Sequence, residues 1–107
     1  MNKNFSNVNF DETSGTEFFM GIVHASADAI KEVLGDYSDG DGEKVNRVWM
    51  NKTSDGTVFT VYDWNERYAS DKSNLYYHIG TFAKEDTEKV VKVLKDAGLD
   101  AYVDKLF

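Results

Sequence analysis

The sequence predicts an α+β fold, a small and mostly antiparallel sheet with helices packed on one face. Three observations predict it. Strand patterns follow one another in the middle of the chain, an Asp-Gly pair marks a hairpin between two of them, and amphipathic helical patterns lie on either side. The expected order is β-α-β-β-β-α, and a sheet with helices on one face buries the apolar side of every element.

The chain of 107 residues is expected to form one domain behind a flexible arm. Residues 1–15 are rich in Asn, Ser, Thr and acids, which is typical of a flexible N-terminal arm. Residues 16–107 carry no Pro-rich or Gly/Ser-rich linker and are expected to form a single α+β domain. There is no cysteine, so neither disulfides nor thiol chemistry is available.

The first strand and helix follow from local signals. Residues 17–25 are apolar on both sides of a strand pattern. Ser26 is a suitable N-cap, Asp28 lies in the first turn where the helix dipole favours an acid, and Gly35 follows as a stop. These residues predict a short helix.

An acidic, Gly-rich loop follows at 36–44. Asp39, Asp41 and Glu43 alternate as calcium ligands do. However, Lys44 and Met50 stand where an EF-hand loop needs its turn glycine and its bidentate Glu. The loop is therefore expected to be solvated, with no metal and no cofactor.

The hairpin is the clearest local feature of the chain. Asp55-Gly56 separates two β-rich runs, and a two-residue type I′ turn favours this pair because both central residues need positive φ. In that register Trp49 faces Tyr62 and Arg47 faces Trp64. The other side is mainly aliphatic and is expected to lie under the helices, so that the Arg and aromatic side points away from them. A three-residue turn with a bulge would instead place Trp49 opposite Val61 and mix the two faces.

The second half of the chain predicts a strand at 75–82 and a helix at 83–97. Tyr76 and His78 share one side of that strand. The helix has early acids, late lysines, and a buried stripe that comprises Val90, Val91, Leu94 and Ala97, with Gly98 as its stop. The pattern of the tail at 99–107 predicts a short terminal helix.

Net charge and motifs limit the function. The formal charge of −7 argues against binding a nucleic-acid polymer or an anionic membrane, and it is compatible with a basic protein surface. No apolar run is long enough to span a membrane, the N-terminus has no apolar signal region, and a cytoplasmic location is expected. His24 and His78 lie in separate strands, and no nucleophile elbow or phosphate-binding loop accompanies them. We therefore expect a protein that is not an enzyme.

The aromatic side of the hairpin is the candidate ligand-binding face. Trp and Tyr rings beside Arg suit stacking on a base or capture of a protein hot spot. The same rings also suit a homo-oligomer interface. The candidate residues are Arg47, Trp49, Tyr62, Trp64, Arg67, Tyr76 and His78.

Two short segments carry a resemblance to known proteins. Residues 58–64 (VFTVYDW) and 77–80 (YHIG) resemble a group of small accessory proteins of tailed bacteriophages, which share F-T-[IV]-Y-D-[WY] followed by [WY]-H-[IV]-G and a C-terminal helix. The similarity covers roughly Val33 to Val93. Residues 34–37 lack the Pro that usually follows the first helix in that group.

The resemblance implies a phage protein in the host bacterial cytoplasm, and small acidic proteins of this kind often antagonise host defences. One hypothesis is sequestration of a small nucleotide immune signal at the aromatic and Arg face. The alternative is an acidic inhibitor that binds a host defence protein and mimics the charge of DNA. A phage structural or regulatory role is a third possibility.

Overall fold

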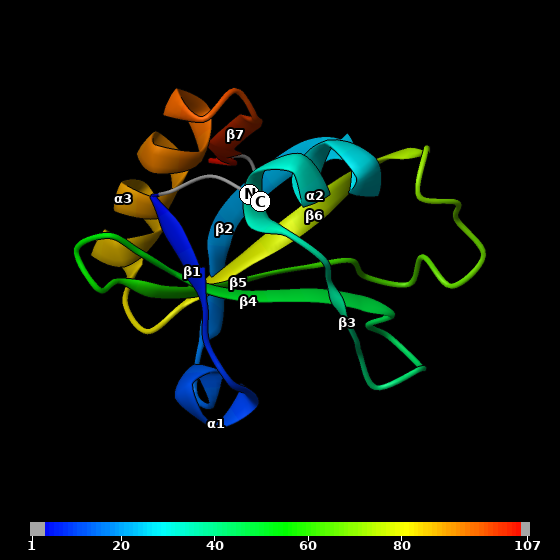
Figure 1. Cartoon of the computed structure of the whole chain (residues 1–107), viewed down its shortest axis with the longest axis horizontal. Helices are drawn as coiled ribbons and strands as arrows, with labels where there is room; N and C mark the ends of the chain where they lie inside the picture. Colours follow the sequence, from blue (N-terminus) through cyan, green and yellow to red (C-terminus); the bar gives the residue numbers. More distant parts are fainter. Residues whose placement is uncertain (1–3, 106–107) are drawn as a thin grey trace.

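The computed structural model describes residues 4–105, which form one seven-stranded antiparallel sheet with three helices (Figure 1). The strand order is β1-β4-β5-β6-β2-β7, and β3 pairs with β4 on the same side as β1. The predicted α+β class with an antiparallel sheet is confirmed. The strands are β1 (Phe5–Asn7), β2 (Glu17–Ser26), β3 (Ser38–Asp39), β4 (Arg47–Thr53), β5 (Val58–Tyr62), β6 (Asn74–Thr81) and β7 (Asp100–Val103), and the helices are α1 (Phe10–Thr13), α2 (Ala27–Leu34) and α3 (Lys84–Asp96).

The helix signals near the ends of α2 and α3 act as predicted. The Ser26 hydroxyl accepts a hydrogen bond from the backbone N–H of Ala29 at 3.1 Å, and Gly35 follows α2 with φ of 85°. In α3, Val90, Val91 and Leu94 of the predicted stripe are buried, and Ala97 is half-buried. Local capping therefore bounds α2, whereas α3 has no side-chain N-cap and is indicated by its apolar spacing.

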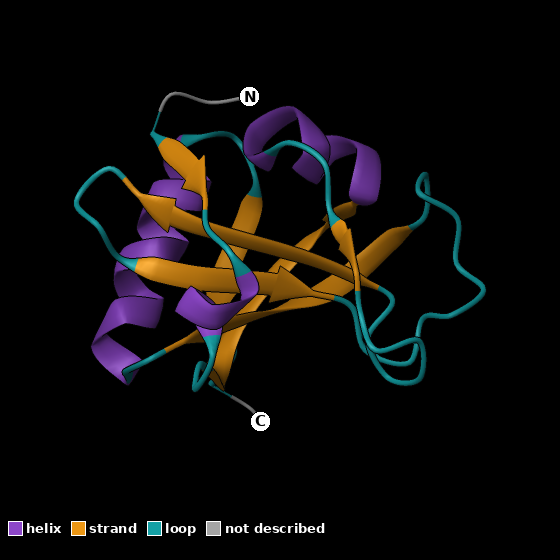
Figure 2. Cartoon of the chain, turned by 60° about the horizontal axis from the view of Figure 1, so that its bottom comes forward, coloured by secondary structure: helices purple, strands orange, loops and turns teal. Residues whose placement is uncertain are grey.

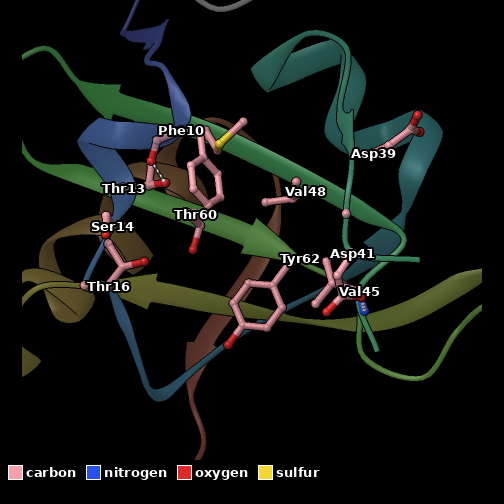
Figure 3. Close-up of a pocket in the computed structure, with 13 residues that line it drawn as sticks. Phe10, Thr13, Ser14, Thr16, Asp39, Asp41, Val45, Val48, Thr60 and Tyr62 are labelled. Atoms are coloured by element: carbon pink, nitrogen blue, oxygen red, sulfur yellow. Dashed lines mark hydrogen bonds between the residues drawn. The ribbon is translucent and has the colours of Figure 1, made fainter. Parts of the chain in front are cut away.

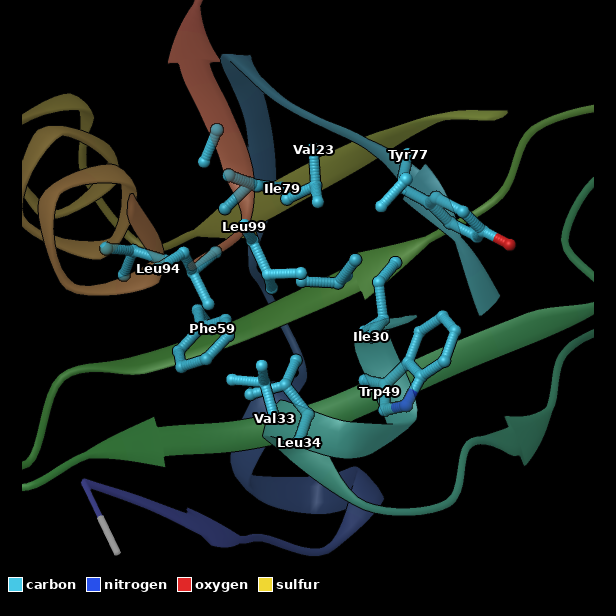
Figure 4. Packing of buried hydrophobic residues seen from close by; sticks show 14 of the residues in the cluster. Val23, Ile30, Val33, Leu34, Trp49, Phe59, Tyr77, Ile79, Leu94 and Leu99 are labelled. Carbon is cyan, nitrogen blue, oxygen red and sulfur yellow. The ribbon is translucent and has the colours of Figure 1, made fainter. Parts of the chain in front are cut away.

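The core lies between one face of the sheet and the helices α2 and α3 (Figure 4). Ile30 and Leu34 of α2 and Leu94 of α3 meet Trp49, Phe59, Tyr77, Val23 and Ile79 of the sheet, all fully buried. Each large apolar side chain of this kind contributes about 1.5–3 kcal/mol when it leaves water. We call this side of the sheet the core face and the opposite side the outer face.

The hairpin register differs from the expected one. Trp49 pairs with Val61 and Met50 with Thr60, so the two-residue turn is wrong and the bulged three-residue turn is present. Thr53 donates its N–H to the carbonyl of Thr57 at 2.9 Å, and Gly56 carries the single positive φ of the turn, 90°. Because side chains alternate along a strand, this slip by one residue moves every side chain of β4 to the other face relative to β5.

The slip reverses the expected position of two candidate residues. Arg47 and Trp49 lie on the core face, where they are 7% and 1% exposed. The prediction that they point away from the helices is therefore wrong. Trp49 and Phe59 supply large apolar area to one core in this register, and burial of that area favours it over the local preference for a type I′ turn.

The N-terminal segment is structured from residue 4 onward, unlike the expected flexible arm. β1 pairs with β4, and Phe5 packs edge-on against Phe59 with ring centroids 5.9 Å apart. Asn9 and Glu12 form a capping box that begins α1. α1 lies beside the outer face (Figure 2), so the prediction of helices on one face holds for α2 and α3 only.

The tail forms a strand where a terminal helix was predicted. Residues 100–103 form β7, which pairs with β2, and Leu99 and Ala101 are buried. Gly98 ends α3 with φ of 101°, which lets the chain reverse toward the sheet edge. The alternation of buried and exposed residues fits a strand at least as well as a helix, and the unpaired edge of β2 decides between them. Residues 106–107 lie outside the described part.

Candidate functional site

Four rings gather on the outer face, and we call them the outer aromatic cluster: Phe18, Tyr62, Trp64 and His78. The imidazole of His78 lies at the centre. Phe18 stacks on it with centroids 4.1 Å apart and planes 15° apart. Trp64 is nearly parallel to it at 6.1 Å, and Tyr62 meets it edge-on at 5.4 Å.

Three strands and the loop after β5 position this cluster. Tyr62 of β5 and His78 of β6 are direct cross-strand partners. Phe18 comes from β2, on the far side of β6, and Trp64 follows β5 by two residues. Trp64 is 46% exposed, whereas the other three are half-buried, so the indole offers the largest area to a partner.

Burial keeps the cluster uncharged near neutral pH. Desolvation lowers the pKa of His78 below its usual value, so the neutral imidazole is favoured. Desolvation also raises the pKa of Tyr62, which keeps the phenol protonated. The surface is therefore one of neutral stacked rings, which suits contact with another ring or with an apolar side chain.

A second stack lies beside the cluster on the same face. His24 of β2 and Tyr76 of β6 are parallel at 4.2 Å, and Tyr76 is 62% exposed. Asp100 of β7 places a carboxylate 3.7 Å from His24 Nδ1. This end of the outer face therefore has an acidic border.

A cleft of about 690 Å³ lies on the other side of Tyr62 (Figure 3). Its floor consists of outward-facing residues of β4 and β5. Phe10 and α1 form one wall, and the acidic loop forms the other. The floor residues are Val48, Met50, Thr60 and Tyr62. Tyr62 belongs to both the cleft and the outer aromatic cluster, so the two form one continuous surface.

The acidic loop is ordered by its own carboxylate. Asp41 Oδ1 accepts backbone N–H groups from Glu43, Lys44 and Val45 at 2.8, 3.1 and 3.0 Å. These bonds lower the pKa of Asp41, which therefore holds a negative charge at the edge of the cleft. Within residues 4–105, no group of three or more His, Cys, Asp or Glu residues is arranged to hold a metal ion.

Of the seven candidate residues, three meet and two are buried elsewhere. Tyr62, Trp64 and His78 meet in the outer aromatic cluster. Arg47 binds the carboxylates of Asp63 and Asp71, and the Trp49 indole N–H donates to the Gly35 carbonyl at 2.8 Å. Both lie inside the protein and are unavailable to a ligand on the outer face.

The remaining two candidates are exposed and contact rings other than the four of the cluster. Tyr76 belongs to the stack with His24. Arg67 lies in the loop between β5 and β6, with its guanidinium 5.8 Å from the centroid of the Tyr68 ring. Tyr68 is 93% exposed.

Sequence reasoning missed Phe18 and His24. Both lie on the strand predicted at 17–25, whose apolar residues on both sides gave no indication of an outer face. A bulge with Met20 at φ of 68° interrupts the pairing with β6 between Phe18 and Gly21. The pairing of β2 with β6, which local sequence does not specify, brings Phe18 onto His78.

The chain matches no protein-family model, no curated protein and no solved structure. Within the described residues, no helix has the length and apolar character to cross a membrane. The geometry of the outer face therefore carries the functional argument.

Proposed function

We propose that this chain is a non-catalytic binding protein that uses its outer face to engage a basic surface of another protein. One observation carries the proposal: the outer aromatic cluster and the cleft are continuous through Tyr62 and have carboxylates at both ends. Trp and Tyr dominate binding hot spots because a large ring leaves water at a low entropic cost. A partner with an apolar anchor and a basic rim complements this surface.

The charges favour a protein partner over a nucleotide. Stacking on a base would use the rings, but a nucleotide also needs a cation for its phosphate. Of the two candidate arginines, Arg47 is bound to Asp63 and Asp71, which leaves Arg67 in the loop after Trp64 as the exposed one. Asp41 and Asp100 place negative charge at the two ends of the surface. The net charge of −7 also favours a basic partner over an anionic nucleotide.

The resemblance to small phage accessory proteins narrows the search for the partner. We propose a host bacterial defence protein, reached in the cytoplasm, as the first partner to test. Nucleotide sequestration is the second candidate, favoured by the nearly parallel rings of Phe18, His78 and Trp64.

Site-specific photo-crosslinking tests the proposal. A benzophenone amino acid replaces Trp64 in one protein and Lys92 in a matched control, since Lys92 is exposed on α3, a helix that covers the core face. In a bacterial extract, the Trp64 position is expected to yield a specific adduct that excess wild-type protein suppresses. A variant with Trp64→Ala should suppress it far less.

The dissociation constant of the purified partner then tests whether Trp64 contributes to binding. Trp64→Ala is expected to weaken the dissociation constant at least about 10-fold, which is roughly 1.4 kcal/mol, whereas Lys92→Ala should leave it unchanged. Affinity should fall with added salt because the complementary charges are screened. Equal affinity in both variants would contradict the proposed surface.

Thermal denaturation against cyclic and ADP-ribose-type nucleotides tests the second candidate. A nucleotide at 100 times its dissociation constant should stabilise the protein by about 2.7 kcal/mol and raise Tm by roughly 10 °C. Such a shift, lost in Trp64→Ala, would establish nucleotide binding in place of protein binding.

A further inference from the structure

The loop that carries Trp64 is long but held at several points. Residues 63–73 join the neighbouring antiparallel strands β5 and β6 and project from the end of the sheet (Figure 1, right). Hairpin loops usually have about two to five residues, and longer ones are commonly functional or mobile. Here Asn65 donates its N–H to the Lys44 carbonyl at 2.8 Å, which fixes the start of the loop beside the acidic loop.

The guanidinium of Arg47 joins three points of this loop. Nη1 donates to Asp63 at 3.0 Å, Nε donates to Asp71 at 2.9 Å, and Nη2 donates to the carbonyl of Ala69. Asp63 is fully buried and also accepts the backbone N–H groups of Asn46 and Arg47 at 2.7 and 3.1 Å. Arg47 therefore contacts the first residue of the loop and two residues near its end.

Asp71 connects the same loop to the helix layer. It accepts from Lys31 Nζ at 2.9 Å and from the Tyr37 hydroxyl at 3.1 Å. Its carbonyl accepts the backbone N–H of Asp28, in the first turn of α2, at 3.0 Å. The loop is thus closed at its base and fastened to α2, while its outer part remains exposed.

Closure at the base places Trp64. This residue follows Asp63 directly, and the next residue, Asn65, has the left-handed φ of 59° that turns the chain away from β5. Asp63 cannot move without breaking its bonds to Arg47 and to the backbone of β4. These contacts favour the position in which the ring centroids of Trp64 and His78 lie 6.1 Å apart.

We infer that Arg47 is a positioning residue: it latches the 63–73 loop at its base and thereby holds Trp64 in the outer aromatic cluster as part of a preformed binding surface. This inference rests on the proposed function for its purpose, but the latch itself is testable without a partner. A preformed surface loses less conformational entropy on binding than a mobile one.

Two readouts report on the loop in the purified protein. Arg47 and Arg67 are the only arginines in the chain, and Arg47 is buried, so an arginine-specific protease acting on the folded protein reports opening of the loop at Arg67. The imidazole proton resonances of His78 report the indole, because the ring current of Trp64 shifts them. Trp64→Leu supplies the reference resonance position without the indole.

Asp71→Asn and Arg47→Met are the latch variants, and Lys92→Met is the matched control on α3. Both latch variants are expected to raise cleavage after Arg67 at least about 10-fold. Arg47→Met, which also removes the contact with Asp63 beside Trp64, is expected to move the His78 resonances toward the Trp64→Leu position. The control should do neither. Arg47→Lys, which can reach fewer of the three acceptors, should fall between wild type and Arg47→Met.

Wild-type cleavage rates in both latch variants, or wild-type His78 resonances in Arg47→Met, would overturn the inference. If Arg47→Met does not fold, Arg47→Lys decides, since it keeps a positive charge beside Asp63 but loses part of the contacts with the loop. The proposed function fails separately, when Trp64 crosslinks no partner although the latch variants open the loop. Unchanged partner affinity in an opened variant would reject the positioning role while leaving the partner established.

Discussion

The two tryptophans show how differently the two faces of this sheet use the same kind of side chain. Trp49 on the core face is 1% exposed, and its indole N–H is bonded to the Gly35 carbonyl. Trp64 beside the outer face is 46% exposed, and its ring lies nearly parallel to that of the half-buried His78. The first is a packing residue with its polar atom satisfied. The second presents a ring that a partner could cover.

Ring geometry follows the same division except at Tyr62, which meets His78 edge-on on the outer face. On the core face, Trp49 meets Tyr37 and Tyr77 edge-on, at 74° and 79° between planes. On the outer face, Phe18 on His78 and His24 on Tyr76 are nearly parallel. Edge-on contacts interlock inside a core, whereas a parallel stack leaves a flat ring face that a further ring can join. The difference teaches that aromatic content alone does not identify a binding face.

Truncating each tryptophan to Ala should give the largest difference in the free energy of unfolding between the two faces. Trp49→Ala is expected to lower the free energy of unfolding by about 3–5 kcal/mol, because it leaves a cavity and an unpaired Gly35 carbonyl. Trp64→Ala should cost about 1 kcal/mol or less, as befits a half-exposed ring. Urea denaturation measures both. Similar losses in the two variants would break the distinction between the faces.

Acid should weaken the latch on the core side with a smaller effect. Hydrogen bonds from Lys31 and Arg47 hold the pKa of Asp71 at about 2 in the folded protein. This value lies below that of the unfolded chain, about 3.9, so the stabilisation is complete above pH 5 and is lost as pH falls toward 2. We expect a loss of about 1–2 kcal/mol, allowing for solvent screening.

Urea denaturation between pH 5 and pH 2 measures this contribution. Asp71→Asn should flatten that part of the profile. Asp96→Asn, which removes an exposed ion pair with Lys92, should leave the profile close to that of the wild type. A profile unchanged by Asp71→Asn would show that the carboxylate is not held in this way.

The hairpin turn sets the face of β4 on which Trp49 lies. Its conformation also predicts whether Asp55→Gly raises or lowers the stability of the protein. Asp55 is not among the residues with positive φ, and its carboxylate accepts the Thr57 N–H at 3.1 Å. Asp55→Gly should therefore cost about 1 kcal/mol, through the lost bonds and the freer unfolded chain. In a two-residue type I′ turn, Gly at this position would be favourable, so a gain in stability would contradict the register. Ser54→Ala is the control.

The smallest effect concerns the outer face itself. Burial lowers the pKa of His78 in the folded protein, so the unfolded chain binds the proton more readily. Stability should fall slightly as pH drops below about 6.5 and level off once it is below the folded pKa. His78→Gln should remove this component from unfolding curves at pH 7.5 and 5.5. An unchanged difference would assign the effect to another group.

The sequence by itself determined the elements that depend on neighbours in the chain. Ser26 and Gly35 bound α2, the stripe with Val90 and Leu94 defines the buried side of α3, and the pair 55–56 locates the hairpin. Capping, apolar spacing and turn chemistry act over about four residues, so a single sequence contains them. The α+β class follows from the order of these elements. Three of the candidate site residues, Tyr62, Trp64 and His78, were also found in this way.

Only the tertiary structure decided which side chains of β4 face the core, which segments pair with the edges of the sheet, and that Arg47 is buried. One residue more or less in the turn exchanges the faces of β4, and the balance rests on how much of Trp49 the assembled core can bury. β1 and β7 form because the edges of β4 and β2 offer backbone hydrogen bonds to distant segments. Arg47 is internal because Asp63 and Asp71, far along the chain, reach it in the folded protein. Such long-range pairing energies depend on the whole fold, and no local pattern encodes them.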